Sequence, residues 1–410
     1  MKILMFGHKY VPGREGGVEI VVAELAKRMA AEGHEVTLYN RRRRQGNGAS
    51  APTEYEGCRL REVFTVNKRA LDAPVYAYFA TKHAVKQAKK EHLDVIHVHA
   101  EGPCLFLRRF GKPGSKKRAK MPRIVVTIHG LDWQRGKWGG LASAVLRYGE
   151  KQAVKYADDI IVLSESNRDY FRKTYGRETI YLPNGVAPAT PHAAELITEK
   201  WGLGRDGYIL FLARIVPEKG LHYLIDAWQS LRARVHTDKK LVIAGGASHS
   251  SDYYREIVDK CAGDDSIVMT GFVEGQTLAE LYSNAALYVL PSDIEGMPMS
   301  LLEAISYGNT CLVSDIPENR EVVGDGHLTF RHGDVSDLAA KLEAVLTGEA
   351  LRDRTAPGER KAPATWDEIT EKTLRVYRGE PTDGGTATGG AQTNTETESK
   401  HEKAVSQLVL

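Results

Sequence analysis

The stretch Tyr208-Ile-Leu-Phe-Leu-Ala-Arg-Ile-Val-Pro-Glu-Lys-Gly220 decides the fold of this chain. Its apolar first part, Tyr208–Ala213, has the length of a buried strand. A turn containing Arg214, Lys219 and Gly220 follows, and a helical segment begins beyond the glycine. A strand, a charged glycine turn and a helix in this order form the repeating unit of parallel α/β folds.

The same pattern recurs along both halves of the chain. In the second half the further apolar runs are Lys240–Ala244, Ser266–Met269, Leu287–Leu290 and Thr310–Val313. In the first half they are Lys2–Phe6, Gly33–Tyr39, Asp94–His99, Arg123–His129, Asp159–Leu163 and the strand end Tyr181–Val186, with a helix from about Val18 to Ala31. We predict an α/β protein with two doubly wound, Rossmann-like domains, whose strands point their carboxyl ends into a ligand cleft.

Composition excludes several classes of protein. The chain has 410 residues, 42% of them hydrophobic, which is enough for two globular domains. Its formal net charge of +3 is too small to indicate nucleic-acid binding, and its four cysteines lack the spacing of a zinc site or a disulfide framework. No run approaches the roughly 20 apolar residues of a transmembrane helix. The first apolar run, Met1–Gly7, is too short for a signal peptide, so we expect a cytoplasmic protein.

The segment Glu295-Gly-Met-Pro-Met-Ser-Leu-Leu-Glu303 places two carboxylates eight positions apart. A helix that opens after Pro298 would set them roughly 12 Å apart on nearly the same face. That exceeds the ~5–9.5 Å between the two carboxyl groups of a glycosidase. It suits a ligand with hydroxyls at both ends and a negative middle near the helix N-terminus, which is the form of a nucleotide sugar. Two exposed glutamates beside an amphipathic helix would show the same spacing.

Glycine-rich and basic turns follow strands in both halves. The turn Pro12–Gly17 lies between a strand and a helix, where bare backbone N–H groups can face an anion. It lacks the G-x-G-x-x-G spacing of a dinucleotide site, which argues against a dehydrogenase. In the second half, Arg214 and Lys219 offer a planar fork and a point charge for a diphosphate. Solvated surface charge is an equal interpretation of that pair.

Histidines stand at two strand ends of the first half. His129 precedes Gly130 and is placed to point into the cleft. His97 and His99 alternate on one strand face, without a third Cys or carboxylate in sequence reach to complete a metal site. We expect these two to be structural or to line the cleft. Because no Asp-x-Asp pair stands at a strand end either, we expect no metal ion.

Together these motifs resemble a known family. Their order and places are those of the retaining glycosyltransferases of family 4, which have the GT-B fold; the matching residues are Gly16-Gly17, His129, Arg214, Lys219 and Glu295-x7-Glu303. The resemblance spans residues 1–378. It implies an acceptor domain at residues 1–185, a donor domain at 186–364, and a last helix at 365–379 that returns to the first domain. The Thr, Gly and Ser-rich residues 380–410 are expected to be a disordered tail.

Two local features refine the resemblance. The stretch His129–Trp138 is similar to a subgroup that builds cell-surface polysaccharides and includes bacterial rhamnosyl- and other hexosyltransferases. Met297 and Pro298 stand where many relatives carry Phe-Gly. Because proline has no N–H, one backbone contact to the donor is missing or shifted, which bears on the identity of the sugar.

The resemblance also implies roles in donor binding and catalysis. Arg214 and Lys219 would hold the donor diphosphate, Glu303 the ribose, and Glu295 a hydroxyl of the donor sugar. His129, Glu295, Arg214 and Lys219 would be the catalytic residues.

The remaining matches complete the expected donor site. Gly16 and Gly17 would approach the phosphate and the acceptor side, Gly296 and Met297 would line the donor site at the helix start, and His129 would bond a sugar hydroxyl.

The implied reaction moves a hexose or deoxyhexose from a nucleotide-diphosphate sugar to a glycan or polyprenyl-linked acceptor. It would retain the anomeric configuration and need no metal or other cofactor. Two basic stretches, Arg41–Arg44 and residues 108–123, suggest an anionic membrane surface as a further partner. The main alternative is a nucleotide-sugar epimerase of the same two-domain fold. A phosphorylase with a pyridoxal lysine and a non-catalytic binding module have less support.

Overall fold

A computed structural model describes residues 1–13, 16–42, 51–66, 68, 71–134, 139–247, 251–324, 327–348 and 362–382. The chain forms two compact units. Unit 1 combines Met1–Asn184 with Trp366–Leu410, and unit 2 is Gly185–Thr365. Most of the tail predicted at 380–410 lies outside the described residues, as do Arg43, Arg44 and the end of the His129–Trp138 stretch.

Unit 1 is built on an eight-stranded sheet of order β3-β4-β2-β1-β5-β6-β7-β8. Neighbouring strands run parallel except β3 and β4, which form an antiparallel pair. The strands are β1 (Lys2–Phe6), β2 (Glu35–Arg41), β3 (Glu54–Tyr55), β4 (Cys58–Val63), β5 (Val95–His99), β6 (Arg123–Ile128), β7 (Asp159–Val162) and β8 (Ile180–Tyr181). The α-helices are α1 (Gly17–Ala31), α2 (Asp72–Lys90), α3 (Gly140–Tyr156), α4 (Glu165–Tyr175) and α12 (Trp366–Arg378). Shorter 3-10 helices are η2 (Gly102–Phe110), η3 (Arg118–Lys120) and η4 (Asp132–Gln134).

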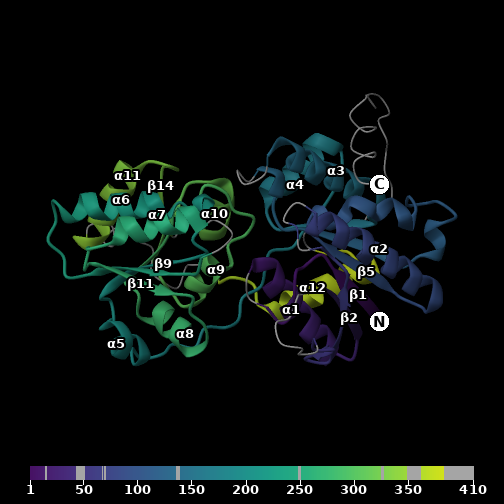
Figure 1. Ribbon diagram of the computed structural model, residues 1–410, viewed down its shortest axis with the longest axis horizontal. Coiled ribbons are helices and arrows are strands. Elements are labelled where there is room, and N and C mark those ends of the chain that lie inside the picture. The colour runs from purple at the N-terminus through teal and green to yellow at the C-terminus, as the bar shows by residue number, and fades with distance from the viewer. Residues whose placement is uncertain are drawn as a thin grey trace. The chain divides into compact units, whose positions relative to one another are not determined.

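The C-terminal helix α12 packs against α1 in unit 1 (Figure 1). Arg28 Nε of α1 donates to Asp367 Oδ1 at 2.5 Å. The aromatic residues near the two ends of α12, Trp366 and Tyr377, are buried. Apolar burial of this kind, more than the exposed ion pair, holds the helix in place.

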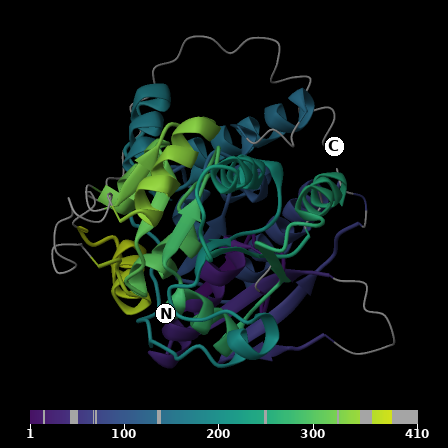
Figure 2. The same cartoon turned by 90° about the vertical axis from the view of Figure 1, so that its left-hand side faces the viewer.

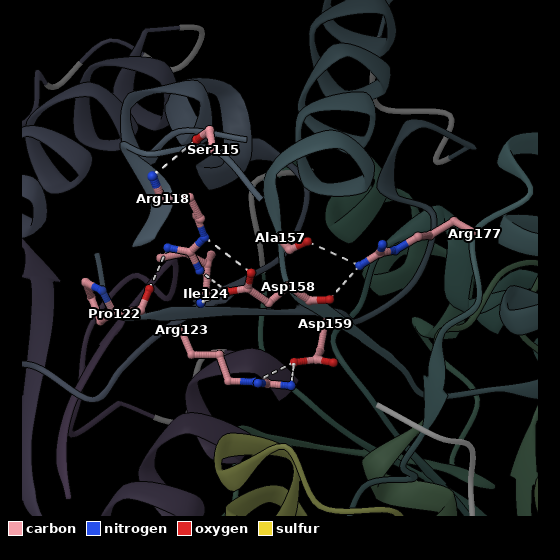
Figure 3. A network of polar contacts seen from close by, with 9 residues as sticks. All are labelled: Ser115, Arg118, Pro122, Arg123, Ile124, Ala157, Asp158, Asp159 and Arg177. Carbon is pink, nitrogen blue, oxygen red and sulfur yellow. Dashed lines mark hydrogen bonds and ion pairs between the residues drawn. The ribbon is translucent and has the colours of Figure 1, made fainter. Parts of the chain in front are cut away.

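Arginine–aspartate contacts link β6 and β7 at their amino ends (Figure 3). Arg118 is buried and pairs with Asp158, whose Oδ2 also accepts from the Ile124 N–H at 2.7 Å. Arg123 pairs with Asp159 at 2.8 Å. The sequence suggests an anionic membrane surface as a partner of the basic stretch 108–123. Within it, Arg118 and Arg123 pair with carboxylates that later residues supply.

Unit 2 is a six-stranded parallel sheet of order β11-β10-β9-β12-β13-β14. Its strands are β9 (Tyr208–Leu212), β10 (Lys240–Ala244), β11 (Ile267–Gly271), β12 (Leu287–Leu290), β13 (Cys311–Ser314) and β14 (Leu328–Phe330). Its helices are α5 (Leu196–Trp201), η5 (Pro217–Lys219), α6 (Leu221–Arg232), α7 (Ser251–Cys261), α8 (Gly275–Asn284), α9 (Met299–Ser306), α10 (Pro317–Val323) and α11 (Val335–Leu346).

Helices cover both faces of the unit 2 sheet (Figures 1 and 2). One apolar core joins the strands to α6, α7 and α11, and a second joins them to α5, α8 and α9. The predicted α/β class with two Rossmann-like domains is confirmed. The short hairpin β3–β4, the long helix α2 and the strand β14 were not predicted.

Candidate active site

The carboxyl ends of β9, β12 and β13 lie next to one another in the unit 2 sheet. The charged and hydroxyl-bearing residues at these ends include Arg214, Lys219, Ser292, Glu295 and Ser314, together with the acidic Glu218, Asp293 and Asp315. Ligands of open parallel sheets bind beyond this edge. The topology therefore gathers, at the place where a ligand is expected, residues that are far apart in the sequence.

Lys219 and Glu295 form an ion pair at this edge. Lys219 Nζ donates to Glu295 Oε1 at 2.5 Å, and the two side chains are only 13% and 6% exposed. Ser292 Oγ donates to the same carboxylate oxygen at 2.6 Å. Withdrawing two charges from water costs free energy, which close attraction and a further hydrogen bond offset. Both charges are thereby held in fixed positions.

Ser292 is held in turn by the segment after β13. Its carbonyl oxygen accepts from Ser314 Oγ at 2.6 Å, and Asn319 Nδ2 donates to Ser314 Oγ at 2.9 Å. All three side chains are buried, where connected hydrogen bonds fix orientation firmly. The sequence did not reveal these residues as part of the site. Ser292 and Ser314 are small polar residues at or just after a strand end, whereas Asn319 lies in α10 and has no such signal.

Gly220 brings the Lys219 loop against the segment after β12. Its φ of +64° lies in the left-handed region, and a Cβ here would stand 1.9 Å from the Pro291 carbonyl oxygen. Only glycine meets both conditions. The close approach of the two segments places Lys219 within reach of Glu295.

Helix α9 begins at Met299, directly after Pro298, as predicted. Glu295 lies before the helix, so the separation calculated for a continuous helix from Glu295 to Glu303 does not apply. Glu303 is half-buried on α9, and its Oε2 accepts from Tyr282 Oη at 2.9 Å. Burial and the nearby Glu303 carboxylate raise the pKa of Tyr282 well above its usual range, so this phenol stays a donor at neutral pH.

The other predicted donor-side residues lie in the same segments. Gly296 is buried and Met297 half-buried between Glu295 and the start of α9. Arg214 is half-buried in the β9–η5 turn, and its guanidinium pairs with no carboxylate among the described residues. Phe272, directly after β11, is 62% exposed and approaches Gly246 after β10. The sequence analysis did not single out this exposed ring.

In unit 1, Gly16 and Gly17 open helix α1. Gly16 is its N-cap with extended backbone, and Gly17 is its first residue. The buried Glu19 folds back on this turn: its Oε1 accepts from the Lys9 N–H at 2.9 Å, and its Oε2 would lie 2.6 Å from a Cβ at Gly16. A glutamate at this third helical position stabilises helix starts, which is the signal that could have identified it.

His129 follows β6 in unit 1 and is half-buried. Its Nε2 lies 3.1 Å from His99 Nδ1. Burial lowers the pKa of His129 to about 4, against a smaller opposite effect of Asp132 and Glu19. The imidazole is therefore neutral at pH 7. Across the described ranges, no three His, Cys, Asp or Glu side chains gather in a way that suits a metal ion.

Six predicted residues lie in unit 2, after β9, after β12 or on α9, and two of them, Lys219 and Glu295, are in direct contact: Arg214, Lys219, Glu295, Gly296, Met297 and Glu303. The other three, Gly16, Gly17 and His129, belong to unit 1.

Comparison with known proteins assigns a family to both halves. Residues 15–190 match the family model described as Glycosyltransferase Family 4, and residues 194–362 match the one described as Glycosyl transferases group 1. An uncharacterized glycosyltransferase of Methanocaldococcus jannaschii is 27% identical over 405 residues, covering 92% of this chain and 98% of the relative. The O-antigen chain mannosyltransferase B of Escherichia coli is 28% identical over 200 residues, covering 48% of this chain and 51% of the relative.

A solved structure has the same fold. The Anabaena protein HepE in complex with UDP and glucose superposes with a TM-score of 0.67 at 17% identity, covering 92% of this chain and 99% of that one. Two Rossmann-like units with these matches define a glycosyltransferase of the GT-B fold. The chain belongs to the family 4 type of these enzymes, with the family 4 model on its first half and the group 1 model on its second.

Proposed function

We propose that this glycosyltransferase moves a hexose or deoxyhexose from a nucleotide-diphosphate sugar to a glycan or polyprenyl-linked acceptor, with retention, during cell-surface polysaccharide synthesis. The observation that carries the proposal is the Lys219–Glu295 pair, fixed by Ser292 at the carboxyl edge of the sheet beside Arg214. A cation for phosphate and an acceptor for a sugar hydroxyl stand side by side, as a donor with both groups requires.

Each end of such a donor meets a chemically suitable residue. Arg214 and Lys219 bind the diphosphate, and Glu295 accepts a hydrogen bond from a hydroxyl of the sugar. Glu303 accepts a hydrogen bond from the ribose, and Tyr282 Oη helps to fix its carboxylate by donating to Oε2. The exposed ring of Phe272 offers a flat apolar face to the nucleobase.

In unit 1, Gly16 and Gly17 allow the close approach of the phosphate and acceptor, and His129 bonds a hydroxyl of the donor sugar. A side chain at Gly16 would displace the Glu19 carboxylate, so glycine keeps the helix start bare without disturbing it. The bare N–H groups at the start of α1 favour an anion.

The reaction follows from where charge develops. The bond between the anomeric carbon and the diphosphate oxygen breaks, and the acceptor oxygen bonds to the same face of the anomeric carbon. The departing phosphate oxygen takes the acceptor's proton. Positive charge on Arg214 and Lys219 stabilises the leaving diphosphate without a metal ion, since fixed charges need no reorganisation.

The compared proteins support the substrate class. HepE was solved with UDP and glucose, and the Escherichia coli relative is named for an O-antigen chain. The similarity of His129–Trp138 to rhamnosyl- and hexosyltransferases adds the subgroup. No observation favours the epimerase, whose name none of these proteins bears.

We also propose that the enzyme works in the cytoplasm at an anionic membrane surface. Exposed basic residues on and after η2 remain once Arg118 and Arg123 are set aside: Arg108, Lys112, Lys116, Lys117 and Lys120. The other basic run contributes less, because Arg41 pairs with Asp72 at 2.6 Å. Within the described residues we find no helix that could span a bilayer.

The test is calorimetric titration of the full chain with UDP, GDP and TDP, followed by product analysis with the sugar nucleotide of the tightest base. Binding of one nucleoside diphosphate, and an α- or β-linked product with the donor's own configuration, are expected. An inverted product, or conversion of the sugar nucleotide into its epimer without acceptor, would overturn the proposal.

A further inference from the structure

Four histidines lie near the carboxyl ends of three adjacent strands in unit 1. His8 follows β1, His97 and His99 belong to β5, and His129 follows β6. The His97 and His99 rings lie 4.0 Å apart between centroids, and those of His99 and His129 lie 5.3 Å apart. The last three rings therefore form a continuous row of tilted imidazoles that leads from the sheet interior to His129.

At the inner end of this row, both ring nitrogens of His97 form hydrogen bonds. Its Nδ1 lies 2.6 Å from Tyr377 Oη of α12, and its Nε2 lies 2.7 Å from Thr127 Oγ1 of β6. His97 and Tyr377 are both buried. Two hydrogen bonds at opposite sides of an imidazole fix its plane, and the His99 ring packs against it at a tilt.

His99 makes one hydrogen bond and leaves its other nitrogen without a partner. Its Nδ1 contacts His129 Nε2 at 3.1 Å, whereas its buried Nε2 has no partner within the described part of the chain. Burial lowers the pKa of His97 to about 3 and that of His129 to about 4, and brings that of His99 well below its usual value. At pH 7 each ring therefore carries one proton.

The direction of the His99–His129 hydrogen bond follows from this count. If His129 Nε2 donated, the single proton of His99 would sit on Nε2 as a buried N–H without an acceptor. If His99 Nδ1 donates, its Nε2 is a bare lone pair. Orphaned buried N–H groups are rarer in proteins than under-satisfied acceptors, so the second arrangement is favoured.

We propose that His99 is a positioning residue that fixes His129 in the tautomer with the proton on Nδ1. His129 then presents an N–H donor to its ligand, and the ligand oxygen accepts. The half-buried His129 makes no other side-chain hydrogen bond within the described residues, so its Nδ1 is available for this contact. The ligand contact rests on the proposed function, in which His129 bonds a hydroxyl of the donor sugar; the tautomer does not.

The first experiment reads the tautomer directly. Full-length protein labelled with ¹⁵N-histidine is studied at pH 7 by long-range ¹H–¹⁵N correlation, with His129→Gln identifying the resonances of residue 129. We expect a protonated Nδ1 and a bare Nε2 in the unmodified protein. A protonated Nε2, or two equally populated tautomers, would overturn the proposal whatever the enzyme's activity.

Paired variants separate positioning from simple packing. His99→Asn retains a side-chain N–H near the place of Nδ1, whereas His99→Phe keeps a ring for packing but donates nothing. We expect the asparagine variant to keep the Nδ1–H tautomer of His129 and the phenylalanine variant to lose it. The exposed His92 provides the control, since His92→Asn should leave the His129 spectrum unchanged.

Kinetics then test the ligand contact. Loss of one neutral hydrogen bond lowers kcat/KM for the sugar nucleotide roughly three- to tenfold in His99→Phe, with recovery in His99→Asn. If the spectra behave as expected but no sugar nucleotide is turned over by the unmodified enzyme, the proposed function fails and the tautomer assignment stands. Equal kcat/KM in both variants, despite different tautomers, would remove the ligand contact from the proposal.

Discussion

The carboxyl edges of the two sheets differ in charge. In unit 1 the edge carries neighbouring imidazoles that burial keeps neutral, whereas in unit 2 it carries the Lys219–Glu295 pair and Arg214. Both edges are equally suited by topology to bind a ligand. The difference shows how one architecture, used twice in a chain, is made distinct by a few residues at its strand ends: neutral hydrogen-bonding groups in one unit and charged groups in the other.

Truncation before α12 should have the largest effect on the comparison, because it should destabilise unit 1 and leave unit 2 intact. A chain that ends before Trp366 loses α12, whose buried side chains each contribute about 1.5–3 kcal/mol. Their sum is comparable with the whole stability of a domain, about 5–15 kcal/mol. We expect unit 1 to lose cooperative unfolding while unit 2 keeps its transition in calorimetry. A chain that ends at Thr382 is the control and should melt like the full chain; equal melting of both truncated chains would contradict this.

Arg214→Ala should remove charge stabilisation from the unit 2 edge. Loss of one group that stabilises developing charge lowers turnover by roughly 10²–10³-fold. The matched control is Arg205→Ala, since Arg205 is exposed in the same unit and pairs only weakly with the neighbouring Asp206. Steady-state turnover of both variants decides the matter. Similar activities in the two would show that Arg214 is surface charge.

The two glutamates should have separable effects. Glu303→Gln should lower the affinity for a nucleoside diphosphate roughly ten- to a hundredfold, because a hydrogen bond to a charged group is worth about 1.5–3 kcal/mol. Glu295→Gln should lower turnover without lowering the affinity for the nucleoside diphosphate, since Lys219 loses the charge of its internal partner but keeps its own. Calorimetric affinities beside turnover numbers provide the measurement. If both substitutions lower the affinity for the nucleoside diphosphate equally, the residues that bind the sugar and the ribose have been wrongly assigned.

Acid should act on unit 1 through its histidines. An unfolded imidazole binds a proton below about pH 6.5, whereas burial holds the pKa of folded His8 at about 4. Between these values the unfolded state binds more protons, so the free energy of unfolding falls as the pH is lowered from 6.5 to 4. His8→Gln keeps a hydrogen-bond donor for Asn40. In this variant the fall in Tm between pH 6.5 and pH 4 should be smaller by a few degrees. An unchanged pH profile would show that His8 does not contribute.

The smallest effect concerns the membrane. Lys117→Gln should weaken binding to vesicles that contain anionic lipid about fivefold, from roughly 1 kcal/mol per basic residue near the surface. The control is Lys200→Gln, an exposed lysine of unit 2. Flotation at low and high salt measures both. Absence of binding by the unmodified chain at low salt would end the membrane proposal.

The sequence predicted those features that depend on local pattern. Buried parallel strands are continuous apolar runs, which is why Tyr208–Ala213 and its counterparts were recognised. The hairpin β3–β4 and the strand β14 escaped because they are short or alternate with polar residues. The long helix α2 escaped as well, because it is rich in alanine and lysine and has few large aliphatic side chains to mark a buried face.

Features that depend on distant partners could not be predicted. The stretch 108–123 contains no acid, yet Asp158 and Asp159 neutralise two of its arginines. Likewise Ser292 after β12 and Asn319 of α10 are ordinary polar residues until the fold connects them, through Ser314, to Glu295. A charge count over a short window of sequence cannot detect such pairs, because the partner residue belongs to a distant part of the sequence.

The position of α12 has a consequence for synthesis on the ribosome. Unit 1 needs a helix that begins at Trp366, and all of Gly185–Thr365 is translated before it. At about 5–20 residues per second, roughly ten to forty seconds pass between the end of β8 and the emergence of this helix. During that interval the surface of α1 that α12 later covers is exposed, and His97 lacks its hydrogen bond to Tyr377. The nascent first half therefore exposes apolar surface until α12 arrives, whereas the segments of unit 2 are continuous in the sequence.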